Sequence, residues 1–248
     1  MRGSREPFAT KGETSGKWGE KHTLPRDRHL QRYEQAVSAH CRLLNGMRHL
    51  DALDQRFGQD KIFGGLCAIT TALNERREIV QLMPVQSLTF GAQTPSGSQK
   101  ARAIAELFSV ANFDSSNSDD VVQDMWEKWI FIACLSAATC LLRGSIGSIV
   151  AASGGREFLA GLVEECSTIA TAHGHRPTGF VERAKGQLTL AGSPMTASMF
   201  RDMNSGARTE ADHVIGDLVV RAETANVAAP KLKLAYTALR VHDQQRGN

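Results

Sequence analysis

The stretch DMWEKWIFIACLSAATCLLR, from Asp124 to Arg143, constrains the fold of this chain more than any other. It begins polar and then stays apolar from Trp129 to Leu142, interrupted only by Ser136 and Thr139. The apolar run is shorter than the roughly 20 residues that cross a bilayer, and charges close it at both ends. A helix that is hydrophobic on nearly every face is typical of the centre of a larger helical domain. We therefore predict a buried helix over about 119–143.

A single cation, Lys128, stands at the start of this apolar run, between Trp126 and Trp129. A lysine beside a dry core has two interpretations. Its stem lies along apolar surface while the ammonium stays in water, or the amine is held in place as an acid for chemistry. Both interpretations remain open from the residues alone.

The composition excludes several classes of protein. The chain has 248 residues, 42% of them hydrophobic and 22% charged, which is ordinary for a globular protein. The net charge of +3 is too small to indicate nucleic-acid binding. No apolar segment near the start resembles a secretory signal. The cysteines form no C-x-x-C pair and their number is odd, which predicts reduced thiols in a cytoplasmic protein and no zinc site: Cys41, Cys67, Cys134, Cys140 and Cys166.

The first part of the chain predicts a leader and then an incomplete α/β unit. Residues 1–40 are mostly polar, which predicts a disordered or non-family leader. From Cys41 the sequence predicts the end of a strand, a turn at Asn45-Gly46 and a helix that ends at Gly58. Strands are expected over 62–71 and 78–89, the second broken by Pro84, and a helix over 96–113. We interpret 41–117 as a partial Rossmann-type domain.

Every strong pattern after Asp114 is helical, so 118–246 is expected to be an all-helical domain, with DSSNSDD as its linker or helix entry. Further helices are expected around 158–170 and 180–188. Ser193-Pro194 predicts a helix start that puts Met195 at the head of a methionine row. Thr209 is expected to cap the next helix, and Pro230 to open the last.

Two polar positions in the helical part have both a structural and a functional interpretation. Ser198 and Asp202 are four residues apart, so they face one cleft if this segment is helical. Glu210 precedes the apolar stripe of Val214 and Leu218 by one and two turns. It is either a first-turn acid favoured by the helix dipole or a carboxylate at the edge of a site.

Several common motifs are missing. No G-x-G-x-x-G follows a strand, and Gly144-Ser-Ile-Gly147 is interpreted as a helix break. No P-loop or nucleophile elbow is present. The eight histidines show no metal-ligand spacing, and His173 and His175 are interpreted as cations at a helix end.

Four segments together resemble the ketopantoate reductase (2-dehydropantoate 2-reductase) family. They are LLNGMRHLDAL, FGGLCAI, the MWEKW helix, and S-M-x-x-D followed by TEADHVIGDLVVRA, and the resemblance covers about 43–241. The order and spacing of the last segment are the most specific. The resemblance implies a Rossmann domain that holds NADPH, followed by a helical domain of the 6-phosphogluconate dehydrogenase C-terminal type that closes over a 2-keto acid. Here the chain is expected to be an N-terminally truncated member.

The resemblance also implies a role for each matched residue. Lys128 is expected to be the general acid and Glu210 the carboxylate that contacts the substrate hydroxyl. Ser198 is expected to bind the substrate, and Asn45 to lie near the nicotinamide. The implied reaction is NADPH-dependent reduction of 2-dehydropantoate to pantoate, in pantothenate biosynthesis. The implied protein is a cytoplasmic enzyme, compatible with a homodimer, without nucleic-acid or membrane partners.

This chain departs from the family pattern in two places. The first strand and its glycine-rich phosphate loop are absent, and Ile132 and Ser136 stand where many members carry asparagines. Two alternatives therefore remain: a non-catalytic helical module that dimerises or binds a small acid, and an inactive gene fragment.

Overall fold

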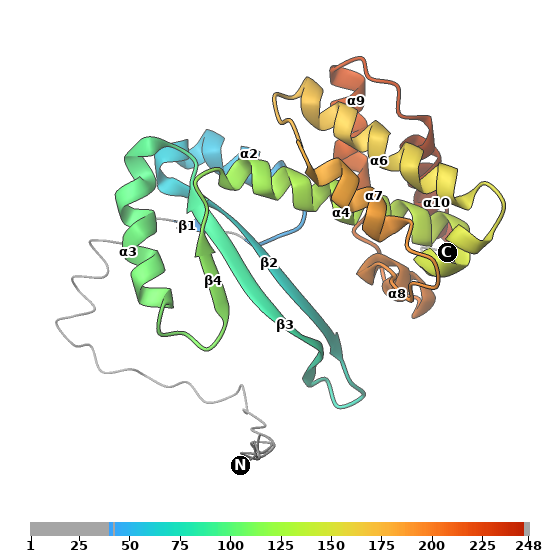
Figure 1. Cartoon of the computed structure of the whole chain (residues 1–248), viewed down its shortest axis with the longest axis horizontal. Helices are drawn as coiled ribbons and strands as arrows, with labels where there is room; N and C mark the ends of the chain where they lie inside the picture. Colours follow the sequence, from blue (N-terminus) through green and yellow to red (C-terminus); the bar gives the residue numbers. More distant parts are fainter. Residues whose placement is uncertain (1–39, 42, 246–248) are drawn as a thin grey trace, which may run out of the picture. The chain divides into compact units, whose positions relative to one another are not determined.

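The computed structural model describes residues 40–41 and 43–245 (Figure 1). The leader expected over 1–40 lies outside the described residues, except for His40. The first elements alternate between strand and helix: β1 His40–Cys41, α2 Arg48–Phe57, η1 Gln59–Lys61, β2 Ile62–Leu73, β3 Ile79–Ala92, η2 Pro95–Gly97, α3 Ser98–Phe108 and β4 Asp114–Asn117. Helices follow: α4 Val121–Leu142, α5 Ile146–Ala151, α6 Gly155–Ala172, α7 Phe180–Leu188, α8 Ser198–Asn204, the π-helical segment η3 Asp212–Gly216, α9 Asp217–Thr224 and α10 Pro230–Gln245.

The strands form one mixed sheet in the order β1-β2-β3-β4. β1 runs parallel to β2, β2 and β3 form an antiparallel hairpin, and β4 runs parallel to β3. The expected incomplete Rossmann-type unit followed by a helical domain is confirmed. The prediction for DSSN was wrong, because these residues form β4 and not a linker. The boundary drawn between 117 and 118 falls between β4 and α4.

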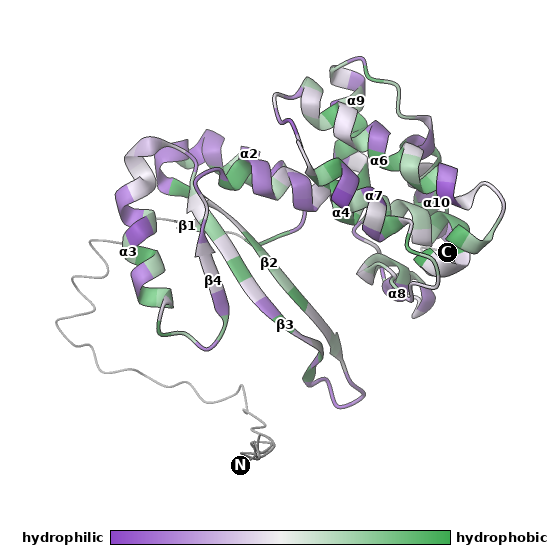
Figure 2. Ribbon diagram, viewed as in Figure 1, coloured by the Kyte–Doolittle hydropathy of each residue, from purple (hydrophilic) through white to green (hydrophobic). Residues whose placement is uncertain are grey.

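The sequence predicted that Pro84 breaks the second strand, but β3 continues through it. The register passes from Ile69↔Gln86 to Thr71↔Gln81, which leaves 82–85 in a bulge on β3. A bulge places the proline where no ladder hydrogen bond is lost. The strands therefore continue into a long hairpin (Figure 2). Its outer part carries exposed apolar side chains such as Ile69 and Ile79. Ile62 and Phe63 of β2 are buried, whereas β2 is no longer buried from Ala68 onward.

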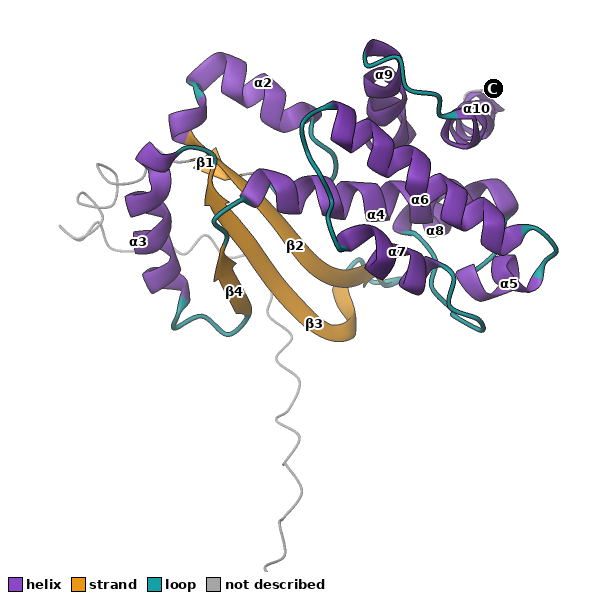
Figure 3. Cartoon of the chain, turned by 45° about the horizontal axis from the view of Figure 1, so that its top comes forward, coloured by secondary structure: helices purple, strands orange, loops and turns teal. Residues whose placement is uncertain are grey.

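Two glycines let α4 pack directly on one face of the sheet. Gly64 and Gly91 are register partners on β2 and β3. A Cβ on Gly64 would lie 2.7 Å from a Val121 methyl group, and one on Gly91 would lie 2.5 Å from the Ser118 carbonyl oxygen. Phe90, the next residue along β3 from Gly91, points to the opposite face. There its ring meets Phe108 of α3 edge to face at 5.4 Å. Figure 3 shows α3 beside β4.

The predicted central helix is α4, and its burial explains its composition. Most residues from Ala133 to Cys140 are almost fully buried, and α4 contacts α5, α6, α7, α8, η3 and α10. Its 22 residues exceed the apolar run in the sequence, and by length and composition it is the one described helix that could cross a membrane. However, 67% of its most apolar window is buried inside the structure, as in a core helix.

The helices α6, α7 and α10 confirm their predictions, but the helix expected at Ser193-Pro194 begins only at Ser198. The earlier residues are extended because they bind the start of α5. The N–H of Gly147 donates to the Ser193 carbonyl at 2.7 Å, and that of Ile146 donates to the Met195 carbonyl at 3.0 Å.

A buried carboxylate fixes the start of α10. Glu165 on α6 accepts hydrogen bonds from the backbone N–H groups of Lys231 and Leu232 at 3.2 and 3.1 Å. The Lys231 ammonium also donates to it, at 3.1 Å. The first turn of a helix has backbone donors without intrahelical acceptors, so Glu165 caps α10 from a neighbouring helix.

Candidate functional site

Lys128 lies in the second turn of α4, where the helix crosses the sheet. Its ammonium donates a hydrogen bond to the carbonyl oxygen of Cys67 on β2 at 2.9 Å. Burial lowers the pKa of the amine, and the nearby Cys67 side chain opposes this by a smaller amount. The half-buried amine is therefore held against a strand, which favours the interpretation as a placed acid.

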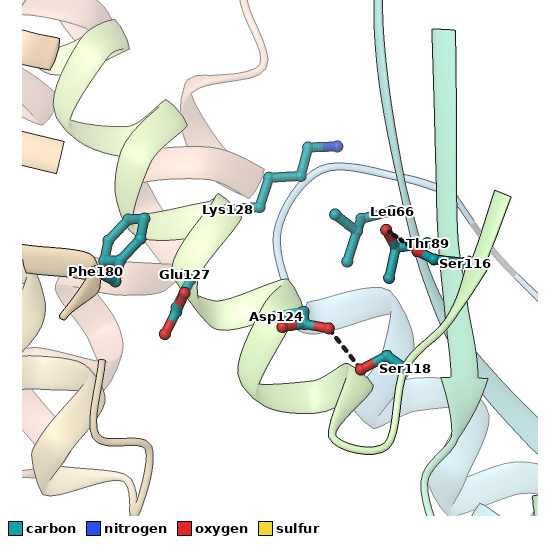
Figure 4. Close-up of a pocket in the computed structure, with 8 residues that line it drawn as sticks. All are labelled: Leu66, Thr89, Ser116, Ser118, Asp124, Glu127, Lys128 and Phe180. Atoms are coloured by element: carbon teal, nitrogen blue, oxygen red, sulfur yellow. Dashed lines mark hydrogen bonds between the residues drawn. The ribbon is translucent and has the colours of Figure 1, made fainter. Parts of the chain in front are cut away.

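An open cleft of about 430 Å³ lies on one side of Lys128 (Figure 4). Most of the residues that line it have polar side chains, and they come from three strands, from the link between β4 and α4, from the start of α4 and from α7: Leu66, Thr89, Ser116, Ser118, Asp124, Glu127, Lys128 and Phe180. The hydroxyls of Thr89 and Ser116 are 3.0 Å apart, and the Ser118 hydroxyl donates to Asp124 at 2.5 Å. One proton serves the Thr89–Ser116 pair, so the other hydroxyl remains able to donate to a ligand.

A much smaller and largely apolar hollow, of about 10 Å³, lies on the Asn45 side of Lys128. It is lined by Leu44, Asn45, Gly46, Gly65, Leu66, Met125, Lys128, Trp129 and Ile132. Gly46 has a positive φ of 82°, and a Cβ there would lie 2.8 Å from the His213 carbonyl oxygen. Glycine at this position thus allows the turn after β1 to pack against η3 and brings Asn45 to the same hollow as Lys128.

The two tryptophans beside Lys128 are fixed by one arginine. The guanidinium of Arg221 lies 5.4 Å from the ring centres of both Trp126 and Trp129, a cation–π distance. Arg221 also forms ion pairs with Asp217 in its own helix and with Asp51 on α2. It therefore links the helix that follows the Asn45 turn to the part of α4 that carries Lys128.

The two histidines predicted to be helix-end cations both pack against Trp126. His173 ends α6, and its Nε2 lies 3.0 Å from the Arg221 carbonyl oxygen. His175 stacks on Trp126 with ring centres 5.0 Å apart, and burial lowers its pKa. The structure therefore favours a neutral His175, in contrast to the expected cation.

Ser198 and Glu210, the other predicted site residues, lie apart from both hollows. Ser198 is exposed at the first position of α8, and Glu210 is exposed just before η3. Asp202 is close to Glu210: burial raises the pKa of Asp202, and the charge of Glu210 raises it further. Within the described residues, Lys128 and Glu210 share no hydrogen bond or ion pair. Their joint role stays a prediction.

Glu210 is connected to the Lys128 region through Trp129. Thr209 accepts a hydrogen bond from the N–H of Ala211 at 3.4 Å, near the cap position expected for it, and its hydroxyl donates to Asp243 at 2.7 Å. One turn after Glu210, the Val214 carbonyl accepts a bond from the Trp129 indole at 2.8 Å. A single π-helical turn inside a helix is frequent at functional sites, and here it directs a carbonyl to the residue next to Lys128.

The sequence analysis missed most of the polar lining of the open cleft. Thr89 and Ser116 are strand residues, Ser118 directly follows β4, and Asp124 and Glu127 precede Lys128 on α4. The alternating exposure along β4 is the pattern that identifies half-buried strands. Because all four residues of DSSN are polar, the sequence shows no alternation of apolar and polar residues there.

The fold and site define a class: a Rossmann-type sheet followed by a helical domain, with a desolvated lysine where the two meet. Comparisons with known proteins agree. The family model described as "Ketopantoate reductase PanE/ApbA C terminal" matches residues 120–243, and "Ketopantoate reductase PanE/ApbA" matches residues 23–94. The second match begins within the range expected to be leader.

Individual relatives point the same way. An uncharacterized oxidoreductase, YkpB, from Bacillus subtilis is 31% identical over 204 residues, covering 82% of this chain and 67% of the relative. A 2-dehydropantoate 2-reductase from Streptococcus pyogenes is 24% identical, covering 77% and 63%. The ternary structure of D-mandelate dehydrogenase with NADH and anilino(oxo)acetate has a TM-score of 0.74 at 16% identity, covering 88% and 73%. The last likeness shows the fold alone.

The chain belongs to the ketopantoate reductase family of oxidoreductases. It spans about two thirds of the length of the curated relatives.

Proposed function

We propose that this chain reduces a 2-keto acid to a 2-hydroxy acid, with a reduced nicotinamide dinucleotide as hydride donor and Lys128 as proton donor. The observation that carries the proposal is the Lys128 amine, desolvated on an apolar helix between an open cleft and the Asn45 hollow. Family membership supports the reaction class. 2-Dehydropantoate is the first candidate substrate, because the family and the S. pyogenes relative are named for it. NADPH is the first candidate cofactor, as the resemblance to the family implies.

The residues around Lys128 suit the nicotinamide end of the cofactor. Asn45 and Leu44 follow the carboxyl end of β1, the edge at which Rossmann-type sheets bind their ligands. Leu44 and Leu66 offer apolar surface for a ring, and the Asn45 amide can hydrogen-bond a carboxamide. When bound, the reduced nicotinamide would supply the hydride that adds to C2 of the keto acid.

The chain's own contribution to the chemistry is proton donation and charge stabilisation. As the C2 carbonyl bond becomes a single bond, negative charge develops on its oxygen. The Lys128 ammonium stabilises that charge and transfers one proton to the oxygen, which gives the hydroxyl of the product. The lowered pKa makes the ammonium a stronger acid than an ordinary lysine. The neutral amine then regains a proton through the open cleft, where Asp124 and Glu127 lie.

The test is NADPH oxidation by the full chain with 2-dehydropantoate, in the native protein and in Lys128→Met. We expect turnover in the native chain and a loss of about 100-fold or more in the variant, the range for removal of a general acid. Lys100→Met, on exposed α3, is the matched control and should retain turnover. Equal rates for native and Lys128→Met proteins would remove Lys128 from the mechanism.

A second candidate is a small-acid-binding module without turnover, because the open cleft beside the Lys128 cation has room for a small acid. It predicts that the keto acid raises the melting temperature and that NADPH does not. The reductase predicts that both do.

A further inference from the structure

The outer part of the β2–β3 hairpin, residues 68–85, is a ribbon of two strands that we call the outer ribbon. Its neighbours in the sheet end before it, because β1 pairs with β2 only at Ile62 and Phe63, and β4 pairs with β3 only from Ser87 to Phe90. The outer ribbon therefore extends beyond both of these strands (Figure 1). Within the part of the chain that the structure describes, no third strand pairs with it. A hairpin of two strands is marginally stable in water by itself.

Large apolar side chains of the outer ribbon are exposed. Ile79 is 74% exposed, and four others are between 40% and 52% exposed: Ile69, Val80, Leu82 and Val85. The charges of the ribbon are confined to the turn at its tip, Glu75-Arg76-Arg77-Glu78, and they sum to zero. Exposed apolar side chains gathered on one element are typical of a surface that binds another protein.

The two edges of the outer ribbon differ in their capacity to pair with a further strand. The β3 edge carries Pro84 within the bulge at 82–85, and both a proline and a bulge prevent pairing. The β2 edge has neither protection, because 64–73 reads GGLCAITTAL, without charge or proline. The Cys67 carbonyl is occupied by Lys128, so the unprotected edge begins at Ala68.

We propose that this β2 edge is where a second copy of the chain binds. The 68–73 segments of two copies run antiparallel about a two-fold axis, and the two outer ribbons form one four-stranded sheet. A two-fold axis brings the same uncharged segment together from both copies, so no like charges are opposed. The edges that carry Pro84 then lie on the outside, which stops assembly at two copies.

The size of the outer ribbon agrees with this partner. Residues 68–85 come close to the roughly 20–30 residues that each partner contributes to a standard interface. Strand pairing would occupy the outward N–H and C=O groups of 68–73, and burial of side chains such as Ile69 would add apolar contact. The proposal does not depend on the proposed function, since it uses neither the cleft nor the Lys128 amine.

Sedimentation velocity of the full chain over a range of protein concentrations tests the association. We expect a species of twice the mass of one chain in the native protein, and only the monomer for Ile69→Lys at the same concentrations, because a lysine on an edge strand prevents pairing. Val110→Lys is the matched control. Val110 is 90% exposed in the turn after α3, outside the outer ribbon, and its variant should remain dimeric.

Three outcomes of this experiment would overturn the proposal: a native chain that is monomeric at every concentration, an Ile69→Lys variant as dimeric as the native chain, or a Val110→Lys variant that is equally monomeric. Circular dichroism of each variant checks that the fold is native.

Hydrogen exchange followed by mass spectrometry tests which surface pairs. We expect the amides of 68–73 to exchange about 10-fold more slowly when the protein is concentrated into the dimer, and this protection to be lost in Ile69→Lys. A dimer without protection at 68–73 would place the interface elsewhere and overturn the proposal. Protection that is the same in the monomer would also overturn it, because the edge would then be covered by the same chain, for example by residues 1–39.

Discussion

Adjacent acids on α6 give the sharpest test of how the helical domain is held together. The perturbation is Glu165→Ala, with Glu164→Ala as its control. Glu165 has 9% of its side chain exposed and is the acceptor for two backbone N–H groups and one ammonium at the start of α10. Glu164 has 64% of its side chain exposed and forms a surface ion pair with Lys185 at 3.0 Å. The two substitutions therefore have the same chemistry in opposite environments.

The expected magnitude follows from that difference. Removing one partner of a buried ion pair costs about 3–5 kcal/mol. Lys231 is 37% exposed and can regain water, so the lower end, about 3 kcal/mol, applies to Glu165→Ala. An exposed pair contributes about 0–1 kcal/mol, which bounds Glu164→Ala. The gain in helix propensity from alanine is similar at both positions.

Urea unfolding followed by circular dichroism measures the free energy of unfolding of both variants against the native protein. In melting temperature, the expected losses are about 6–12 °C for Glu165→Ala and under about 4 °C for Glu164→Ala. Equal losses for the two variants would refute the argument that Glu165 caps α10.

Three further predictions concern the site. Lys128→Met should not lower the free energy of unfolding although it should slow turnover, because burial disfavours the ammonium, as its lowered pKa indicates; thermal unfolding checks this, and a large loss would contradict it. The lowered pKa of His175 means that the unfolded chain takes up a proton first as the pH falls through about 6.5. Stability should therefore decline below that pH, and less so in His175→Phe, as pH-dependent urea unfolding will show. Gly46→Ala should cost about 1–3 kcal/mol more than Gly58→Ala: both glycines have φ 82°, but a Cβ on Gly46 meets the His213 carbonyl and one on Gly58 meets nothing within 4 Å.

The helical half of the fold could be predicted because its signals are local. The apolar run of α4, the proline that opens α10 and the glycine that ends α2 each act within a few residues. The failures depend on contacts between distant segments. Residues 114–117 become a strand only because β3 offers a parallel partner, and the segment from Ser193 to Met195 stays extended because it pairs with the start of α5.

In the candidate site too, local signals identified some residues, whereas others depend on contacts between distant segments. Lys128 was identifiable because a charge within an apolar helix is rare, and Asn45 because the Asn-Gly turn is a strong local signal. Resemblance supplied Ser198 and Glu210, and the structure places them outside the hollows at Lys128. The role of Arg221 could not be predicted, because it depends on rings from α4 and a carboxylate from α2 meeting around one side chain.

The central claim, that the Lys128 amine lies where a 2-keto acid binds, is tested most directly by a lysine-selective ¹³C NMR titration of the full chain. Lys128→Arg assigns the resonance. Our account predicts that the amine titrates below the ordinary lysine pKa and that its resonance shifts when 2-dehydropantoate is added. An amine that titrates like an exposed lysine, with a resonance that the keto acid leaves unchanged, would contradict it.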